Sequence, residues 1–145
     1  MHGSKKIHKS WLKNYKVEKV YHNSRLYIQT LQYLKKQKNL NYQKVLFLFN
    51  NFINNKYPIC NVLIYEKNIV GFVGTTFSQK KYNDKKFLNC NIHSWMVDVN
   101  HRIGSSMLIN QIKKNCIITV LSSLPRLEKT FLKLGFKKFN MKYKI

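Results

Sequence analysis

Polar residues with the chemistry of an anion site lie between an apolar stretch and an amphipathic stretch in the second half of the chain. Trp95–Val99 has the composition of a buried strand, and Ser105–Lys114 has apolar residues at helical spacing. The connection between them offers an arginine and several small residues: Arg102, Gly104, Ser105 and Ser106. A helix N-terminus presents unpaired backbone N–H groups and the positive end of the helix dipole. The segment therefore predicts a site for a phosphate-like anion.

A histidine on the same predicted strand is the first choice for general acid–base chemistry. His93 lies two residues before Trp95, and a histidine side chain titrates close to neutral pH. A partly buried histidine that only bonds its neighbours explains the same residue equally well. Asp98 and His101 follow the strand, where a role in capping or fixing the loop is expected. Glu66 is expected to be a solvated turn residue.

The order of the predicted elements is β-α-α-β-β-β-α-β-α-β, an α/β arrangement around a mixed sheet. The predicted strands are 15–21, 59–65, 69–77, 87–99, 116–121 and 136–145, with a tight turn at 66–68. The predicted helices are 24–38, 42–53, 105–114 and 124–134, and residues 78–86 form a polar, basic loop. Because a helix separates strands 87–99 and 116–121, these two strands should be parallel neighbours with a right-handed crossover.

Local signals add detail to this order. Ser24 and Asn41 are the predicted N-caps of the first two helices, whose apolar stripes are expected to be core. Gly71 and Gly74 within one strand predict a bulge or a close backbone neighbour. Simple alternation along strand 87–99 divides its side chains between two faces. It places His93, Trp95 and Val97 on one face and Ser94 and Met96 on the other.

The composition predicts one folded domain over residues 1–145, with residues 1–14 as a polar, basic arm. With 44% hydrophobic residues, the chain is too apolar for a disordered protein. No apolar run approaches the roughly 18 residues that cross a bilayer, and no apolar segment follows the basic N-terminus as in a secretory signal. A cytoplasmic protein without membrane contact is the expectation. Cys60, Cys90 and Cys116 are odd in number and widely spaced, so free, buried thiols are expected.

The charge is the strongest compositional signal, because 27 Lys and Arg against 5 Asp and Glu give a formal net charge of +22. Such an excess is typical of proteins with anionic partners, nucleic acid first among them. The lysines are scattered along the chain, however, and Lys, Asn, Ile, Tyr and Phe are the residues that A+T-rich codons encode. Codon bias therefore competes with function as the cause of the charge. Phosphate-rich small ligands are compatible with either cause.

The run from Ile59 to Phe136 resembles the GCN5-related N-acetyltransferase (GNAT) superfamily. The matching pieces, in order, are the hairpin Tyr65-Glu-Lys-Asn-Ile-Val-Gly-Phe72, the strand ending Trp95-Met-Val-Asp-Val-Asn-His-Arg102, a helix, a strand, and the closing Phe131-Leu-Lys-Leu-Gly-Phe136. The resemblance implies a GNAT-like, mixed but mostly antiparallel central sheet with helices on both faces. The family usually has a further C-terminal strand after the last one that this sequence offers.

The family's phosphate motif, Arg/Gln-x-x-Gly-x-Gly/Ala, aligns with Arg102-Ile-Gly-Ser105-Ser-Met107. Arg102 matches, and Ser105 and Met107 replace the two glycines, as in a divergent branch with an Arg-x-x-Ser loop. The resemblance implies that this loop holds the pyrophosphate of an acyl-coenzyme A, with the pantetheine between the two parallel strands where they splay apart. The thioester carbonyl would be polarised by a backbone N–H near Met96 or Val97. The implied coenzyme contacts are Met96, Val97, Val99, Arg102, Ile103, Gly104, Ser105, Ser106 and Met107. Arg126 would contact the 3′-phosphate, and the alternative is that it lies on a solvated face of its helix.

The function that the resemblance implies is an acyl-CoA-dependent N-acyltransferase, in the simplest case an N-acetyltransferase, without a metal. An unidentified amine would attack acetyl-CoA or another acyl-CoA directly in a ternary complex on a monomer or homodimer. Where the family often has a tyrosine general acid, this sequence has Phe131, which leaves Ser122, Ser123 or water as the proton donor. The catalytic candidates are therefore His93 and Ser123. A non-catalytic coenzyme A-binding scaffold and a basic nucleic-acid-binding module are the alternatives.

Overall fold

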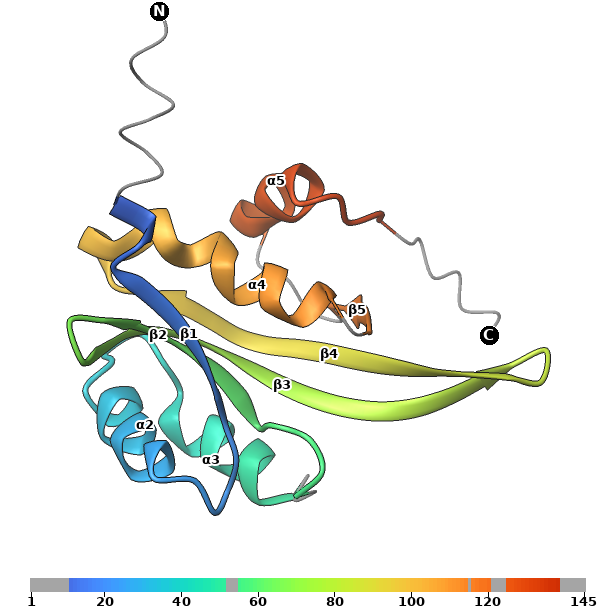
Figure 1. Cartoon of the computed structure of the whole chain (residues 1–145), viewed down its shortest axis with the longest axis horizontal. Helices are drawn as coiled ribbons and strands as arrows, with labels where there is room; N and C mark the ends of the chain where they lie inside the picture. Colours follow the sequence, from blue (N-terminus) through green and yellow to red (C-terminus); the bar gives the residue numbers. More distant parts are fainter. Residues whose placement is uncertain (1–10, 52–54, 115, 121–124, 139–145) are drawn as a thin grey trace, which may run out of the picture.

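A five-stranded sheet forms the centre of the structure, with helices on both of its faces (Figure 1). The computed structural model describes residues 11–51, 55–114, 116–120 and 125–138. The strands are β1 (Tyr15–Val20), β2 (Cys60–Tyr65), β3 (Asn68–Tyr82), β4 (Lys85–Val97) and β5 (Ile117–Thr119), in the order β1-β2-β3-β4-β5. Neighbouring strands are antiparallel from β1 to β4, whereas β4 and β5 are parallel.

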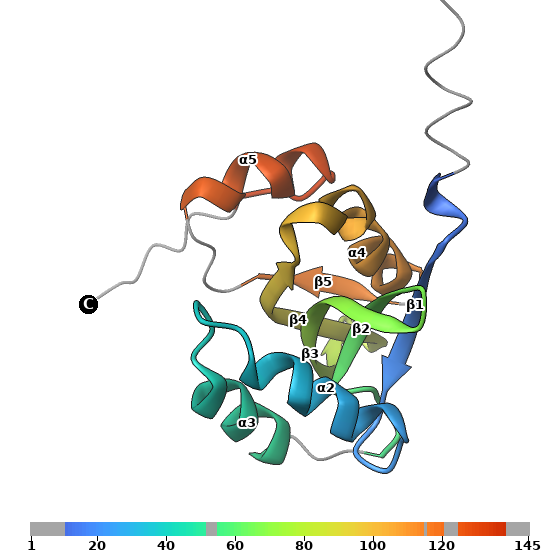
Figure 2. The same ribbon diagram turned by 90° about the vertical axis from the view of Figure 1, so that its left-hand side faces the viewer.

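The helices lie in two pairs, one on each face of the sheet (Figure 2). One pair is α2 (Leu26–Lys35) with α3 (Tyr42–Asn51), and the other is α4 (Ser105–Lys113) with α5 (Pro125–Lys133). A 3₁₀ helix, η1 (Val99–Gly104), joins β4 to α4. In the part of the chain that the structure describes, no helix has the length and apolar character to span a membrane.

The fold predicted from the sequence is confirmed in its main features. The sheet is mixed and mostly antiparallel, and the strands on either side of α4 are parallel neighbours. The last predicted strand, 136–145, is not seen at residues 136–138, which are irregular, and its remainder lies outside the described residues.

Each face of the sheet buries its own apolar cluster against the helices that cover it. The α2/α3-side core cluster contains Val20, Leu34, Val45, Phe49, Ile59, Cys60, Val62 and Phe72. The α4-side core cluster contains Leu63, Val70, Val73, Cys90, Ile92, Leu108, Ile109, Ile112 and Phe131. Each large apolar side chain buried in this way contributes roughly 1.5–3 kcal/mol. The predicted helical stripes are therefore core, as Leu34, Val45 and Phe49 show.

The two predicted N-caps have different outcomes. Asn41 is confirmed, since its Oδ1 accepts a hydrogen bond from the Lys44 N–H at 3.0 Å. Ser24 is wrong as a cap, because α2 begins after Arg25 without a side-chain cap. The Ser24 hydroxyl instead donates to the Tyr21 carbonyl at 2.8 Å. A serine side chain is short enough to bond the backbone on its own N-terminal side, and here it closes the turn between β1 and α2.

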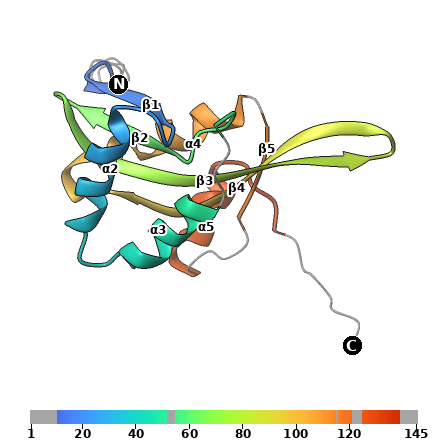
Figure 3. The ribbon, with the colours of Figure 1, turned by 90° about the horizontal axis from the view of Figure 1, so that it is seen from below.

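The predicted basic loop 78–86 is wrong, because β3 and β4 continue through it as a paired ribbon that projects beyond the helices (Figure 3). We call residues 79–88 the β-arm. Its tip is Asn83-Asp84, with φ of 45° and 61°, as in the two-residue turns that match the twist of a hairpin. Most side chains of the arm are exposed. Without a buried face, the arm has no apolar alternation by which the sequence could have shown a strand.

All three cysteines are free thiols, as predicted, with Cys60 and Cys90 buried and Cys116 half-buried. Burial raises the pKa of the Cys60 and Cys90 thiols. Both thiols therefore stay protonated at neutral pH and act as small apolar core residues.

Candidate functional site

The edge of β4 that faces β5 is paired over only part of its length. β5 pairs with β4 at Asn89, Cys90 and Asn91, whereas β4 continues along β3 as far as Val97. In the described residues, the section from Ile92 to Val97 therefore has no strand on its outer side. We call residues 92–97 the open edge of β4. An unpaired edge can hydrogen-bond an extended ligand as if the ligand were another strand.

The open edge contains a β-bulge at Ser94. Phe72 of β3 pairs with Met96, and Gly74 pairs with His93, so β4 has one residue more than β3 between these two pairs. Ser94 has a φ of 54°, in the left-handed region that non-glycine residues seldom adopt. A bulge bends the strand and interrupts its regular hydrogen bonds. The glycines of β3 predicted an irregularity here, and that prediction is confirmed.

The bulge overturns the predicted facing of the β4 side chains. Trp95 and Val97 pack against the α4-side core cluster, whereas His93 lies near Phe49 of α3. Met96 packs against the α2/α3-side core cluster, on the same face as the histidine. Strict alternation along the sequence had grouped His93 with Trp95 and Val97. One extra residue shifts the alternation of the rest of the strand.

His93 occupies a tight space between β3 and α3. Its ring centroid lies 6.4 Å from that of Phe49, and its Nδ1 lies 3.3 Å from Ser94 Oγ. A β-carbon at Gly74 would lie 2.1 Å from His93 Cε1, so glycine is needed to leave room for the ring. Burial lowers the pKa of His93 to about 4, with a smaller contribution from the charge of Lys44. The imidazole is therefore neutral at pH 7, which corrects the expectation of a base that titrates near neutrality.

On the opposite face of the open edge, Trp95 belongs to an aromatic cluster. Its ring centroid lies 5.5 Å from that of Phe131, which lies 5.1 Å from that of Phe136. Trp95 Nε1 is buried and has no hydrogen-bond partner among the described residues. Such a donor costs about 1–3 kcal/mol unless a bound molecule or water accepts from it. Trp95 was not among the predicted site residues, and no local signal in the sequence marked it as one.

A polar row occupies the α3 face of β4. Cys90 and Ile92 belong to the α4-side core cluster, so alternation places Asn89 and Asn91 on the other face, before the histidine. Asn89 Nδ2 donates to Thr119 Oγ1 at 3.3 Å. Asn91 Oδ1 is buried, and no described residue is its hydrogen-bond partner. The α3 face of β4 thus offers hydrogen-bonding groups, whereas the other face is closed by aromatic rings.

The segment predicted to bind an anion is wound into η1 and is not an open loop. The Ser105 N–H donates to the Arg102 carbonyl, so a backbone donor that the sequence assigned to a phosphate is used within the chain. The Arg102 side chain is exposed, and so are those of Val99 at 72% and Ile103 at 39%. The exposed side chains of this segment are those of Val99, Asn100, Arg102 and Ile103, and Ser106 is half-buried.

Two hydrogen bonds anchor this segment to the sheet and its helices. The Tyr33 hydroxyl of α2 donates to Asp98 Oδ1 at 2.8 Å, and burial together with this bond raises the pKa of Tyr33. His101 Nδ1 lies 3.0 Å from the Tyr15 hydroxyl oxygen. Asp98 and His101 therefore fix the segment, as predicted. Glu66 is an exposed turn residue, also as predicted.

The other residues of the phosphate motif face the protein interior. Gly104 is buried, and a β-carbon there would lie 2.8 Å from Leu63 Cδ2, so glycine allows η1 to approach β2. Met107 packs against the α4-side core cluster. Its bulk is thus directed into the core and not toward an anion beside Arg102. Ser105 is half-buried at the start of α4.

Two of the remaining predicted contacts lie beyond the bulge in β4, and the others lie in residues or side chains that the structure does not describe. Met96 and Val97 pair regularly with β3, so the irregular backbone lies earlier than these two residues, at Ser94. Ser123 lies outside the described residues, and so does Ser122. Arg126 is in α5, but its side chain is not among those described.

Solved structures with this fold include acetyltransferases from several organisms. A Trypanosoma brucei acetyltransferase matches with a TM-score of 0.56 at 15% identity, over 90% of this chain and 98% of that one. The Bacillus subtilis N-acetyltransferase YlbP, solved with coenzyme A, matches with a TM-score of 0.59 at 16% identity, over 88% of each chain. A predicted acetyltransferase from Clostridium acetobutylicum, solved with acetyl-CoA, matches with a TM-score of 0.57 at 15% identity, over 90% of this chain and 95% of that one. No family model and no curated protein matches the sequence.

Proposed function

We propose that this chain, which has the fold of the GNAT acetyltransferases, is an acyl-CoA-dependent N-acyltransferase that uses acetyl-CoA or another acyl-CoA. The observation that supports the proposal best is the open edge of β4 with its bulge at Ser94. This edge lies beside a buried indole N–H that has no partner in the part of the chain that the structure describes. An extended pantetheine along the edge would pair with the backbone and bring an acceptor to that N–H.

The direction of attack follows from the two faces of the open edge. Trp95 and Phe131 fill the α4 side, so the acceptor amine would approach from the α3 side, where His93 lies. A backbone N–H at the bulge would polarise the thioester carbonyl, since donors aimed at the developing oxyanion stabilise the transition state. A neutral imidazole can accept a hydrogen bond from the attacking amine and hold its lone pair toward the carbonyl carbon.

The leaving group needs a proton that Phe131 does not have. When the C–S bond breaks, the thiolate would take a proton from water or from Ser123, whose catalytic role stays a prediction. At the far end of the coenzyme, Arg102 would contact the pyrophosphate, because it is an exposed cation at the junction of η1 and α4.

Arg102→Ala is expected to remove most of the thermal stabilisation that acetyl-CoA gives to the protein. At about 100 times its Kd, a ligand stabilises the folded state by about 2.7 kcal/mol, which is roughly 5–10 °C for a domain of this size. Without the charged hydrogen bonds of the guanidinium, binding should weaken roughly tenfold to a hundredfold. Differential scanning fluorimetry across a ligand titration measures the effect.

The matched control is Arg25→Ala, which removes another exposed arginine at the start of α2. This variant should keep the full shift. The absence of any shift in the wild type at millimolar acetyl-CoA would count against coenzyme binding altogether.

A non-catalytic coenzyme A-binding scaffold is the nearest alternative, and Phe131 favours it. The residue is only 7% exposed and packs between two other aromatic rings, so no general acid stands at that position. The scaffold predicts that acetyl-CoA binds while a thiol-reactive dye detects no release of free thiol with any amine. Release that depends on an amine and saturates with its concentration would eliminate the scaffold.

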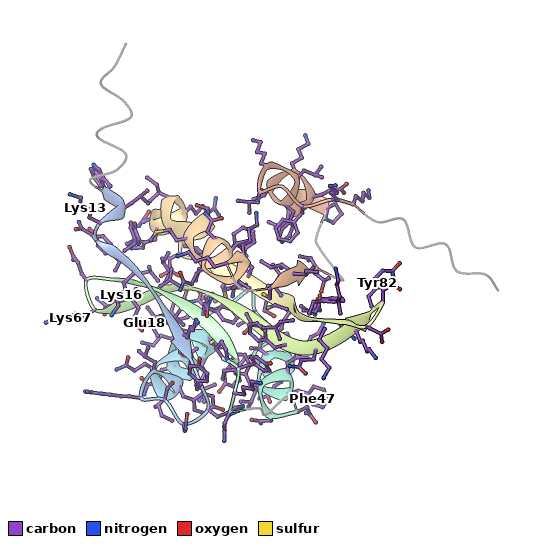
Figure 4. All side chains as sticks on the ribbon, turned by 45° about the vertical axis from the view of Figure 1, so that its right-hand side comes forward. Lys13, Lys16, Glu18, Phe47, Lys67 and Tyr82 are labelled. Carbon is purple, nitrogen blue, oxygen red and sulfur yellow. The ribbon has the colours of Figure 1, made fainter. Side chains whose placement is uncertain are left out.

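The β-arm favours a second function, which is nucleic-acid binding. Lys81 and Lys86 are directly opposite each other in the ribbon, where like charges destabilise pairing, although Lys81 also contacts Asp84 at 2.8 Å. Tyr82 projects from the arm and is 72% exposed (Figure 4). A two-stranded ribbon fits the major groove of DNA, and lysines contact phosphates. The β-arm therefore has the shape and the positive charge expected of an element that binds nucleic acid.

A double variant Lys81→Gln and Lys86→Gln tests this second function. If the arm binds DNA, the slope of log K against log salt should fall in magnitude by about 2, roughly one for each phosphate that a lysine no longer neutralises. A control double variant is Lys13→Gln with Lys67→Gln, since both lysines lie away from the arm (Figure 4). Equal slopes for the two double variants, measured by fluorescence anisotropy with a duplex, would show that the arm makes no special contribution.

A further inference from the structure

We infer that the acceptor is a weakly basic amine, uncharged near neutral pH and carried on an anionic molecule. The inference rests on the proposed function and concerns the α3 face of β4. It has two grounds. The first is the set of groups on this face, which are His93, Asn89 and Asn91 beside Lys44. The second is that the Asp and Glu side chains lie elsewhere in the fold.

The Asp and Glu side chains lie outside β4 and α3, the two elements that carry His93 and Phe49. There are 5 Asp and Glu in the sequence, and all are described. Four of them are Glu18 paired with Lys16, Glu66 in the β2–β3 turn, Asp84 at the tip of the β-arm and Glu128 paired with Lys138. The fifth, Asp98, is five residues beyond His93, roughly 16 Å along an extended strand, and accepts the hydrogen bond of Tyr33.

His93 is a poor substitute for a carboxylate base. It is half-buried beside the Phe49 ring and Gly74, and burial lowers its pKa to about 4. A lysine-type ammonium, with a pKa of about 10.4, is far too weak an acid to give its proton to such an imidazole. An amine that is already uncharged has its lone pair available and needs no base before it attacks.

The proton balance of the transfer is satisfied for such an amine. Its nitrogen forms a bond to the acyl carbon, the C–S bond breaks, and the sulfur leaves with the electron pair. The nitrogen becomes positively charged and acidic only after it has attacked. It then loses its proton to water or to His93, and the thiolate gains one proton, so that an amide and a free thiol result.

The positive charge around the site favours an acceptor molecule that also carries a negative charge. The protein has a formal net charge of +22, and Lys44 of α3 lies close enough to His93 to lower its pKa. A positive field repels ammonium groups and attracts anions. Asn91 Oδ1 is buried on the same face, with no partner among the residues that the structure describes, and would accept a hydrogen bond from the same molecule.

The test compares kcat/KM at pH 7.5 for 4-aminobenzoate, aniline and Nα-acetyl-lysine, each with saturating acetyl-CoA. About one lysine-type amine in a thousand is uncharged at this pH, whereas the amine of 4-aminobenzoate is uncharged, so kcat/KM should be higher for 4-aminobenzoate than for Nα-acetyl-lysine. From pH 7 to 9, kcat/KM for Nα-acetyl-lysine should rise about tenfold per unit, whereas that for 4-aminobenzoate should stay flat.

Two variants complete the test. Lys44→Gln should reduce the preference for 4-aminobenzoate over aniline several-fold, because only the first carries a negative charge. Asp98→Asn should leave the shape of the pH profiles as it is, since this carboxylate is held by Tyr33.

The outcomes separate the inference from the proposed function. Similar kcat/KM for Nα-acetyl-lysine and 4-aminobenzoate, or loss of a titration limb in Asp98→Asn, would overturn the inference and leave the acyltransferase standing. The absence of a thermal shift with acetyl-CoA, or of thiol release with every amine, would overturn the proposed function and the inference with it.

Discussion

Gly74→Ala is expected to destabilise the protein by about 2–3 kcal/mol, because it forces a side chain into a filled core. The new β-carbon would lie 2.1 Å from His93 Cε1 and 2.4 Å from its Nδ1. The ring has little room to withdraw, since Phe49 lies on α3 beside it. Urea denaturation at pH 7.5 measures the change, which corresponds to a fall in Tm of roughly 10 °C.

The cause of the destabilisation can be isolated with a second substitution. His93→Ala removes the ring, so adding Gly74→Ala to that variant should cost much less than it costs in the wild type. The difference is the coupling energy of a double-mutant cycle. If Gly74→Ala costs the same in both backgrounds, the clash with His93 is not its cause.

The stability of the protein should fall by up to about 3 kcal/mol between about pH 6.5 and pH 4 because of His93. Its pKa is lowered from 6.5 to about 4 in the folded chain, so in this window the unfolded chain binds a proton that the folded chain does not. The contribution is therefore complete above pH 6.5 and is lost as the pH falls. The slope should approach 1.4 kcal/mol per pH unit, as for about one proton.

His93→Gln is the variant that separates this titration from those of other groups. His22, bonded to the Phe49 carbonyl at 2.7 Å, and His101 remain in both proteins. The difference between the two free energies of unfolding, measured by urea denaturation from pH 4 to 8, should change with pH in the stated direction. Parallel curves would mean that the imidazole titrates normally and is open to solvent.

Local sequence signals predicted most elements of the fold, because they depend on short-range chemistry. The apolar stripe with Val45 and Phe49 and the cap at Asn41 were confirmed. The β-arm was missed, since both of its faces are in solvent and its strands are specified by the pairing partner. Ser24 was misassigned because a serine can bond the backbone on either side of itself.

The candidate site shows more clearly which features the sequence indicates and which depend on the tertiary structure. The sequence by itself determined the ingredients: a strand, a following helix that begins at Ser105, an arginine between them, and glycines that predicted an irregular β3. Only the tertiary structure decided that the extra residue lies at Ser94 and that His93 and Trp95 therefore face opposite helices. It also decided that the segment around Arg102 is a 3₁₀ helix and that His93 is partly buried, which lowers its pKa. Strand register and burial are sums of contacts between residues distant in sequence, and a pattern of neighbouring residues does not contain them.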